Sequence, residues 1–158
     1  MDTSHDNDLL LERQLCFALS VASRSVVGAY RPVLEKLNLT HPQYLVMLAL
    51  WEESPRTVRS LGQALAMESA TLSPMLKRLE ALGLLTRTRV PGNERALAVT
   101  LTAAGRDLRS KAREVPVTMM ERLGLTREQV EALNEAMHGI IRATGTSLLP
   151  SNNSRDVG

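Results

Sequence analysis

Two short stretches of alternating side chains interrupt a sequence that is otherwise helical in pattern, and they limit the possible folds more than any other feature. They span residues 84–90 (LLTRTRV) and 96–101 (ALAVTL). The segment between them begins Pro91-Gly92-Asn93-Glu94, which has the composition of a turn. The pattern predicts one β-hairpin with basic residues near its tip, set within a helical chain.

The remaining periodicity places apolar residues three and four positions apart, which is typical of helices. Thr40, Ser69 and Thr102 are expected to open helices, and Thr126-x-x-Gln129 has the form of a capping box. Pro32 is expected to kink the first helix or to end its first section. The predicted helices span about residues 9–36, 40–52, 57–66, 69–82, 102–123 and 126–144.

The order of these elements predicts the fold class. Two helices joined by a short turn and followed by a basic hairpin form the winged helix-turn-helix arrangement, in which the second helix enters the major groove of DNA. We therefore expect a mainly α protein with a two-stranded β wing, whose winged helix-turn-helix domain spans residues 39–102. Residues 9–38 and 103–146 form a second, helical region, and residues 1–8 and 147–158 are expected to be disordered tails.

Composition and charge narrow the possible functions. The only cysteine is Cys16, which excludes an internal disulfide and a cysteine-rich metal cage. The three histidines show no metal-ligand spacing with each other or with Cys16, so no metal or other cofactor is expected. The formal net charge is only +2, but residues 56–95 hold seven basic and three acidic residues, a net of +4. Such a basic middle segment fits a nucleic-acid footprint or an ordinary solvated face.

The sequence also bears on where the protein works. No apolar run reaches the roughly 20 residues that span a membrane. The first residues, MDTSHDND, are acidic where a signal peptide is basic. We therefore expect a soluble, cytoplasmic protein with no membrane partner, and in that compartment a lone thiol stays reduced.

Several motifs resemble the MarR family of bacterial transcription regulators, over about residues 9–145. Asn93-Glu94-Arg95 and residues 99–105 (VTLTAAG) resemble the Asp-x-Arg wing signature of that family and its Leu-Thr-x-x-Gly helix start. Four further blocks resemble the OhrR subgroup, whose members sense organic hydroperoxides. These blocks are residues 15–19 (LCFAL), 29–32 (AYRP), 39–47 (LTHPQYLVM) and 71–80 (TLSPMLKRLE).

The resemblance implies a homodimer in which residues 9–38 and 103–146 interleave as a dimerisation region. It also implies that peroxide oxidises an N-terminal cysteine and that oxidation releases a pseudo-palindromic DNA operator. The chain departs from the subgroup at Ser20 and His41, where tyrosines usually stand, and at Asn93, where the wing usually carries Asp. We therefore expect fewer hydroxyl donors around the sulfur than in typical relatives.

The residues themselves leave two interpretations of Cys16, a small buried hydrophobic residue or a thiolate that attacks a peroxide. Tyr30 shares the helical phase of Cys16 to within roughly 40°, but 14 residues place it about 21 Å along the axis, so only a partner chain could bring it to the sulfur. His41 can donate to the sulfur and, when protonated, lower the thiol pKa, or it can be an exposed residue beside a helix cap. With no second cysteine, an oxidised Cys16 would be captured by a low-molecular-weight thiol or be overoxidised.

The predicted DNA-binding residues lie on the second helix of the motif and on the hairpin. Short hydroxyl side chains at a helix start reach phosphates and base edges, and arginine binds phosphate bidentately. Arg95 is expected at the wing tip, with Arg87 and Arg89 on the flanking strand as phosphate partners. The full set is Ser69, Thr71, Ser73, Pro74, Lys77, Arg78, Arg87, Arg89 and Arg95.

Some of these residues have a purely structural alternative. Ser69 can serve only as a helix cap, and Thr71 can pack into the interior. Arg78 can form an ion pair with Glu80 or Glu94 instead of contacting DNA.

Four functions are compatible with these sequence features. The first is a DNA-binding repressor that senses organic hydroperoxides by oxidation of Cys16 and then releases its operator. The second is a MarR-type repressor that a small phenolic or drug-like ligand releases, with Cys16 incidental. The third is a one-cysteine peroxidase, but the chain lacks the Pro-x-x-x-Thr-x-x-Cys motif of such enzymes. The fourth is an architectural DNA-binding protein, which site-specific footprinting at one operator would exclude. We expect the first, non-enzymatic function, with DNA, a second subunit, organic hydroperoxide and a small thiol as partners.

Overall fold

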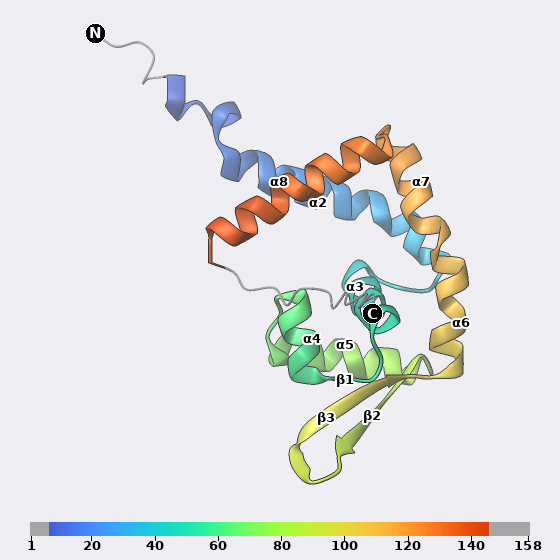
Figure 1. The fold of residues 1–158 in the computed structure, drawn as a ribbon. Coiled ribbons are helices and arrows are strands. Elements are labelled where there is room, and N and C mark those ends of the chain that lie inside the picture. Colours follow the sequence, from blue (N-terminus) through green and yellow to red (C-terminus); the bar gives the residue numbers. More distant parts are fainter. Residues whose placement is uncertain (1–6, 146–158) are drawn as a thin grey trace, which may run out of the picture.

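The computed structural model describes residues 7–145 and is mainly helical, with one small antiparallel sheet (Figure 1). The winged helix-turn-helix unit lies at one end with its hairpin projecting, and α6 and α7 join it to α8, which lies with α2 toward the other end. This confirms the predicted fold class. The elements are η1 (Asn7–Leu9), η2 (Leu11–Arg13), α2 (Leu15–Glu35), α3 (His41–Glu52), β1 (Arg56–Thr57), α4 (Val58–Leu65), α5 (Ser69–Ala81), β2 (Leu85–Val90), β3 (Asn93–Leu101), α6 (Ala103–Ala112), α7 (Glu114–Leu123) and α8 (Arg127–Ala143).

The first helical region begins differently from the prediction. The long helix starts at Leu15, after two short 3-10 helices, and not at residue 9. Pro32 does not end it: Pro32 lies in the last turn, and the helix continues to Glu35. Most of the predicted tails at residues 1–8 and 147–158 lie outside the described residues.

Side-chain caps begin several helices where the sequence predicted them. Thr40 Oγ1 accepts from the backbone amide of Gln43, and Gln43 Oε1 accepts from the backbone amide of Thr40, which completes a capping box. Thr126 and Gln129 form the same pair at the start of α8. Thr102 caps α6. Each such cap stabilises its helix by about 1 kcal/mol.

Ser69 is not a helix cap, so this expectation was wrong. Glu68 occupies the cap position of α5 without a side-chain hydrogen bond, and Ser69 is the first helical residue. The turn between α4 and α5 determines where α5 begins. In this turn Ala66 takes the left-handed conformation (φ 51°), and the Met67 backbone amide donates to the Gly62 carbonyl.

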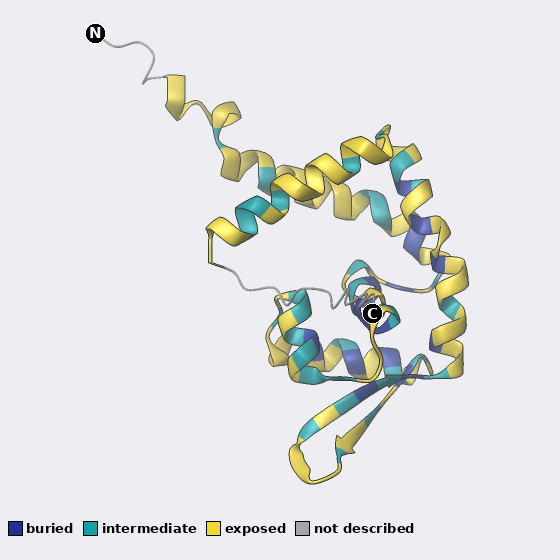
Figure 2. Ribbon diagram, viewed as in Figure 1, coloured by how far each residue is buried: buried dark blue, intermediate teal, exposed yellow. Residues whose placement is uncertain are grey.

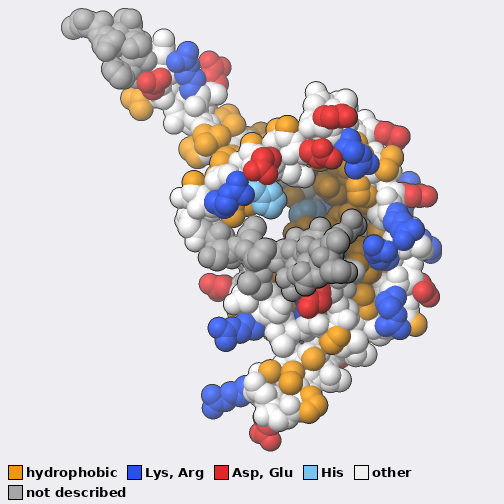
Figure 3. All heavy atoms as spheres, viewed as in Figure 1, with side chains coloured by type: hydrophobic (Ala, Val, Ile, Leu, Met, Phe, Trp, Pro, Cys, Tyr) orange, Lys and Arg blue, Asp and Glu red, His pale blue; other side chains and the backbone are white. Residues whose placement is uncertain are grey.

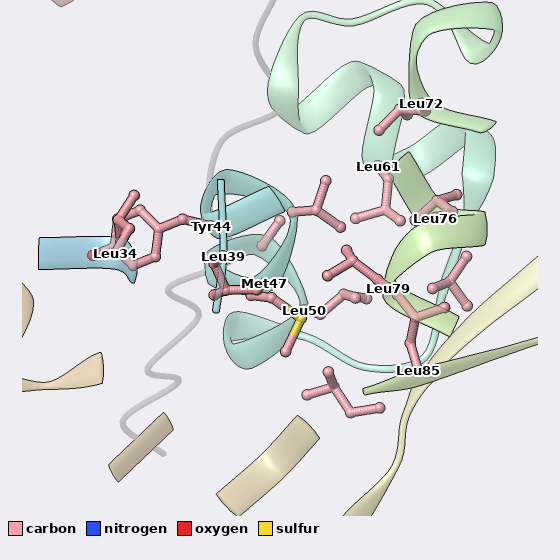
Figure 4. Close-up of a cluster of buried hydrophobic side chains, with 14 of the residues drawn as sticks. Leu34, Leu39, Tyr44, Met47, Leu50, Leu61, Leu72, Leu76, Leu79 and Leu85 are labelled. Atoms are coloured by element: carbon pink, nitrogen blue, oxygen red, sulfur yellow. The ribbon is translucent and has the colours of Figure 1, made fainter. Parts of the chain in front are cut away.

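The core of the winged helix-turn-helix unit is built from leucines (Figure 4). Leu72, Leu76 and Leu79 follow each other at spacings of four and three along α5, and each is 0% exposed. They meet Leu61 of α4 and Leu85 of β2. Burying one leucine fully contributes about 1.5–3 kcal/mol, so this cluster fixes α5 against the sheet.

The sheet contains the predicted hairpin and one strand that was not predicted. β3 pairs with β2 on one side and with β1 on the other. β1 has only two residues, which is too short for an alternating pattern to show in the sequence. Near the tip the pairing is irregular. Arg89 of β2 pairs with Leu97 of β3, but the next residue, Val90, pairs with Asn93, four residues further back along β3. The residues between them form a bulge that projects from the ladder.

The single helix predicted over residues 102–123 is in fact two. α6 ends at Ala112 and α7 starts at Glu114, with Arg113 between them. Pro116 lies in the first turn of α7, and it cannot donate a backbone hydrogen bond to the Ala112 carbonyl. The proline therefore explains the break.

Both α2 and α8 are largely exposed within the chain (Figure 2). The only buried residues of α2 are Val33 and Leu34 near its end, and α8 has none. Leu15 is 61% exposed and Phe17 39% exposed, and Figure 3 shows hydrophobic side chains at the surface along this part of the chain. Exposed apolar side chains that gather on one helix, such as Leu15, Phe17, Val21, Val26 and Val27 of α2, are typical of interaction surfaces. Within residues 7–145, no helix is both long and apolar enough to cross a membrane.

Candidate functional site

Cys16 is the second residue of α2, and it is exposed. Its neighbours Leu15 and Phe17 are exposed as well. Within one chain, Cys16 is therefore not a core residue. The interpretation as a small buried hydrophobic side chain does not describe the single subunit. The thiol lies on the apolar surface that α2 leaves uncovered.

The other two predicted sensing residues do lie together, in a cluster of three rings. The rings of Tyr30 and His41 are 5.5 Å apart and meet edge to face. The ring of Tyr44 is 6.0 Å from that of Tyr30. Tyr30 comes from the C-terminal half of α2, whereas His41 and Tyr44 come from the first turns of α3. Tyr44 was not identified from the sequence, although it lies within the block that resembles OhrR.

Burial shifts the proton equilibria of this cluster. It raises the pKa of Tyr30 above that of a free phenol, and burial together with the neighbouring Tyr30 raises the pKa of Tyr44 to about 12. Both phenols therefore keep their protons and can donate hydrogen bonds. Burial lowers the pKa of His41, so its imidazole is neutral near pH 7. Burial thus disfavours, within one chain, the protonated form that was expected to lower the thiol pKa, and the neutral ring keeps one donor and one acceptor.

Cys16 and Tyr30 are on the same helix but far apart. The helix between them is continuous, so 14 residues separate them by about 21 Å along its axis. The structure therefore brings Tyr30 and His41 together but does not bring Cys16 to them within one chain.

The predicted DNA-binding residues of α5 are all at the surface, so Thr71 does not pack inside. At about 100° per residue they form two stripes, one with Ser69, Ser73 and Lys77, and one with Thr71 and Arg78. Pro74 lies between the stripes. The exposed set is Ser69, Thr71, Ser73, Pro74, Lys77 and Arg78.

The wing arginines differ in what they contact. Arg87 Nε donates to Glu80 Oε2 at 2.9 Å. Glu80, one of the two carboxylates considered as a partner of Arg78, therefore pairs with Arg87 instead. Arg89 Nη1 donates to the backbone carbonyl of Glu94 at 2.7 Å, across the bulge. The guanidinium of Arg95 has no partner within the part of the chain that the structure describes, and it projects from the exposed bulge.

Asn93 takes part in holding the wing tip. Its Oδ1 accepts from the backbone amide of Arg95 at 3.2 Å. An amide oxygen here makes the kind of contact that a carboxylate oxygen would make, so replacing the usual Asp still leaves an acceptor at the base of the wing tip.

A surface hollow that was not predicted lies between the end of α2, the start of α3 and the last turn of α5. It has a volume of about 500 Å³, and Glu35 and Arg78 contribute charged groups to its lining. Gln43 also lines it and is only 6% exposed. Its Oε1 is used by the helix cap, while its amide nitrogen has no acceptor among residues 7–145. No cluster of metal-binding side chains occurs in this same range.

Comparison with known proteins decides the family. The model of the SarA/Rot transcriptional regulators matches residues 29–112. The organic hydroperoxide resistance transcriptional regulator of Bacillus subtilis is 44% identical to this chain over 135 residues, which are 85% of this chain and 89% of that protein. The chain belongs to the MarR family of transcriptional regulators, close to its OhrR subgroup.

Solved structures of other MarR-family regulators share the fold. Reduced AbfR of Staphylococcus epidermidis, bound to DNA, matches with a TM-score of 0.74 and 33% identity, over 89% of this chain and 98% of that one. Overoxidized AbfR has also been solved bound to DNA, and it matches with a TM-score of 0.73. The repressor CouR of Rhodococcus jostii, bound to a 23-mer duplex, matches with a TM-score of 0.76 and 28% identity, over 84% and 96% of the two chains.

The Leu-Thr-x-x-Gly motif has a physical role in this MarR-family chain. The Thr102 amide donates to the Leu84 carbonyl at 3.1 Å, and Thr102 Oγ1 donates to the Gly83 carbonyl at 2.6 Å. Trp51 Nε1 donates to the Gly105 carbonyl at 2.9 Å. Gly105 is so close to the Leu84 carbonyl that a Cβ would overlap its oxygen. The motif therefore fixes the start of α6 directly on the winged helix-turn-helix unit.

Proposed function

We propose that this chain is a cytoplasmic, homodimeric repressor that binds a pseudo-palindromic DNA operator and releases it when an organic hydroperoxide oxidises Cys16. The observation that carries the proposal is the 44% identity, over 85% of the chain, to a regulator of organic hydroperoxide resistance. The AbfR structures support it as well, because that relative binds DNA and exists in reduced and oxidised forms.

The arrangement of α2 supports the dimer. Cys16 lies on an uncovered apolar surface at one end of the helix, and the Tyr30–His41–Tyr44 cluster lies toward the other end. An antiparallel α2 from a second subunit would cover the apolar surface and place its own cluster beside the thiol. A two-fold axis then generates two equivalent sensing sites.

The proposed chemistry takes place in two steps. The Cys16 thiolate attacks one peroxide oxygen, so that an S–O bond forms, the O–O bond breaks, and the alcohol leaves after taking up a proton. The thiolate of a low-molecular-weight thiol then attacks the Cys16 sulfenic acid, which forms a mixed disulfide and releases water. Peroxide is consumed once per thiol, without turnover, as befits a sensor.

The mixed disulfide is the form expected to release DNA. Overoxidized AbfR was solved bound to DNA, so oxidation by itself does not preclude a DNA complex in that relative. A thiol adduct adds much more volume than two or three oxygen atoms. A packed seam between two α2 helices has no room for it, so the subunits must shift.

A DNA titration of reduced protein, repeated after treatment with cumene hydroperoxide and a small thiol, tests this function. We expect wild-type affinity to fall at least tenfold, with one thiol adduct per chain at Cys16 by intact mass. Cys16→Ser should bind DNA like the reduced wild type and should not respond to peroxide. Release of DNA from the Cys16→Ser variant by peroxide would refute sensing at this residue.

A specific observation also supports a second candidate, a repressor that a small phenolic or drug-like ligand releases. The hollow of about 500 Å³ offers Arg78 and the unpaired amide nitrogen of Gln43 to an acidic group, next to apolar Leu39 and Leu82. In that case Cys16 is incidental. Ligand-induced release that is unchanged in Cys16→Ser, together with no response to peroxide, would favour this candidate.

A further inference from the structure

A single ion pair links the DNA-facing helix to the wing. Among the described residues, Glu80–Arg87 is the only salt bridge between α5 and the β2–β3 hairpin, with an N–O distance of 2.9 Å. The side chains are 40% and 25% exposed, so the pair is partly shielded from water. The sequence suggested a phosphate as the partner of Arg87, but in the structure its guanidinium is held by a carboxylate of its own chain.

The pair extends the hydrophobic contact between the two elements. Side chains alternate along β2, so Arg87 points to the same face of the strand as Leu85. Leu85 is 1% exposed and packs in the core with Leu79 of α5, the residue next to Glu80. Leucine packing therefore fixes the base of the hairpin on the helix, and the ion pair makes the next contact toward the wing tip.

We propose that Arg87 is a positioning residue for DNA binding, which acts through Glu80 to set the angle between the wing and α5. This inference rests on the proposed DNA-binding function. Affinity requires α5 and Arg95 to engage one duplex together, and a hairpin that is already held at the right angle loses less freedom on binding. If Arg87 instead turned to a phosphate, it would leave the Glu80 carboxylate unpaired close to DNA.

The sign of the effect of Glu80→Gln separates the two roles of Arg87. If Arg87 binds phosphate, removing Glu80 frees the guanidinium and removes a negative charge, so affinity rises. If Arg87 positions the wing, Glu80→Gln weakens binding by up to about fivefold for each half-site of the dimer, the limit set by the strength of a partly exposed ion pair. Glu94→Gln is the matched control, because Glu94 is a wing carboxylate with no ion pair in the described chain, and it should leave binding unchanged or tighter.

The dependence of binding on salt gives an independent measure. The slope of log K against log salt is negative, and loss of one phosphate contact reduces its magnitude by about 0.9. We expect a change of about 1.8 for Arg95→Gln, because each of the two subunits loses one contact. Arg87→Gln should weaken binding and leave the slope as in the wild type. A flatter slope for Arg87→Gln would show that Arg87 contacts phosphate and would overturn the proposal.

A double-mutant cycle completes the test, on a duplex that the reduced wild-type protein selects from a random-sequence pool. If Glu80 and Arg87 act as one unit, the Glu80→Gln/Arg87→Gln variant binds no more weakly than the weaker single variant. Losses that multiply would overturn the positioning role alone, while the DNA-binding function would stand. If the wild type selects no sequence, the proposed function fails and the positioning role fails with it.

Discussion

Replacing Gly105 with alanine should destabilise this protein strongly, although alanine is the better helix former. Gly105 is in the first turn of α6, and a Cβ there would overlap the backbone oxygen of Leu84 and lie 3.1 Å from Leu101 Cδ2. Leu84 lies in the bend just before β2, where its amide donates to the Leu79 carbonyl and its carbonyl accepts from the Thr102 amide, so this carbonyl cannot rotate away as a flexible side chain could. The start of α6 must therefore move off the winged helix-turn-helix unit.

The size of the effect follows from the contacts that such a movement breaks. Overpacking a rigid site costs about 1–3 kcal/mol. The hydrogen bonds from Thr102 to Leu84 and from Trp51 to Gly105 contribute about 1 kcal/mol each. The gain in helix propensity offsets about 1 kcal/mol. We expect Gly105→Ala to lower the free energy of unfolding by about 3 kcal/mol, a large part of the roughly 5–15 kcal/mol that holds a domain together.

Urea denaturation at one fixed protein concentration measures this difference, since the stability of a dimer depends on concentration. The matched control is Gly139→Ala in α8, where the nearest atom to a new Cβ is the flexible Arg142 guanidinium at 3.9 Å. That variant should be as stable as the wild type or slightly more stable. If Gly105→Ala lies within about 1 kcal/mol of the wild type, the close approach of α6 to Leu84 is not what fixes this junction.

Three further predictions concern the wing, the ring cluster and a helix cap. Arg95→Ala should leave the urea midpoint unchanged, because its side chain is exposed, and should reduce the magnitude of the salt slope of DNA binding by about 1.8, since each subunit of the dimer loses one phosphate contact; an unchanged slope would remove Arg95 from the interface. Because burial lowers the pKa of His41, the neutral ring contributes its whole share of the stability above the unfolded pKa of about 6.5. That share is lost as the pH drops toward the folded pKa. His41→Asn should therefore lose less stability than the wild type when the pH falls from about 7 to about 5. If the urea midpoints of the variant and the wild type fall by the same amount over that range, the buried neutral ring is contradicted. Thr40→Ala should lower stability by about 1 kcal/mol through the lost capping box, which a thermal melt can detect as a drop in Tm.

Local chemistry made much of the fold predictable from the sequence. Thr40 and Thr126 each have a glutamine three residues later, so each helix start depends only on neighbouring residues. The hairpin was predictable because Pro91-Gly92 can form little other than a turn between two alternating stretches. The break at Arg113 was not predicted, since the helix expected over residues 102–123 ran through Pro116, which lies in the first turn of a separate helix.

The parts of the site that escaped prediction depend on contacts between distant segments. The ion pair of Arg87 with Glu80 joins residues seven apart on different elements, and composition gives no reason to prefer it over Arg78. The neutral state of His41 follows from burial against Tyr30, which the folded chain alone provides. The surroundings of Cys16 depend on a second subunit, so neither the sequence nor one chain defines them.

The position of Cys16 and Tyr30 at opposite ends of one helix has a consequence for genetics. If every sensor combines Cys16 of one subunit with Tyr30 of the other, a mixed dimer of Cys16→Ser and Tyr30→Phe chains carries one site with both defects and one site with none. Two alleles that are each silent to peroxide would then restore part of the response when expressed in the same cell. A Cys16→Ser allele expressed beside the wild type would instead halve the number of working sites in each mixed dimer, and the induction curve of the regulated gene would show how many sites must react before the operator is released.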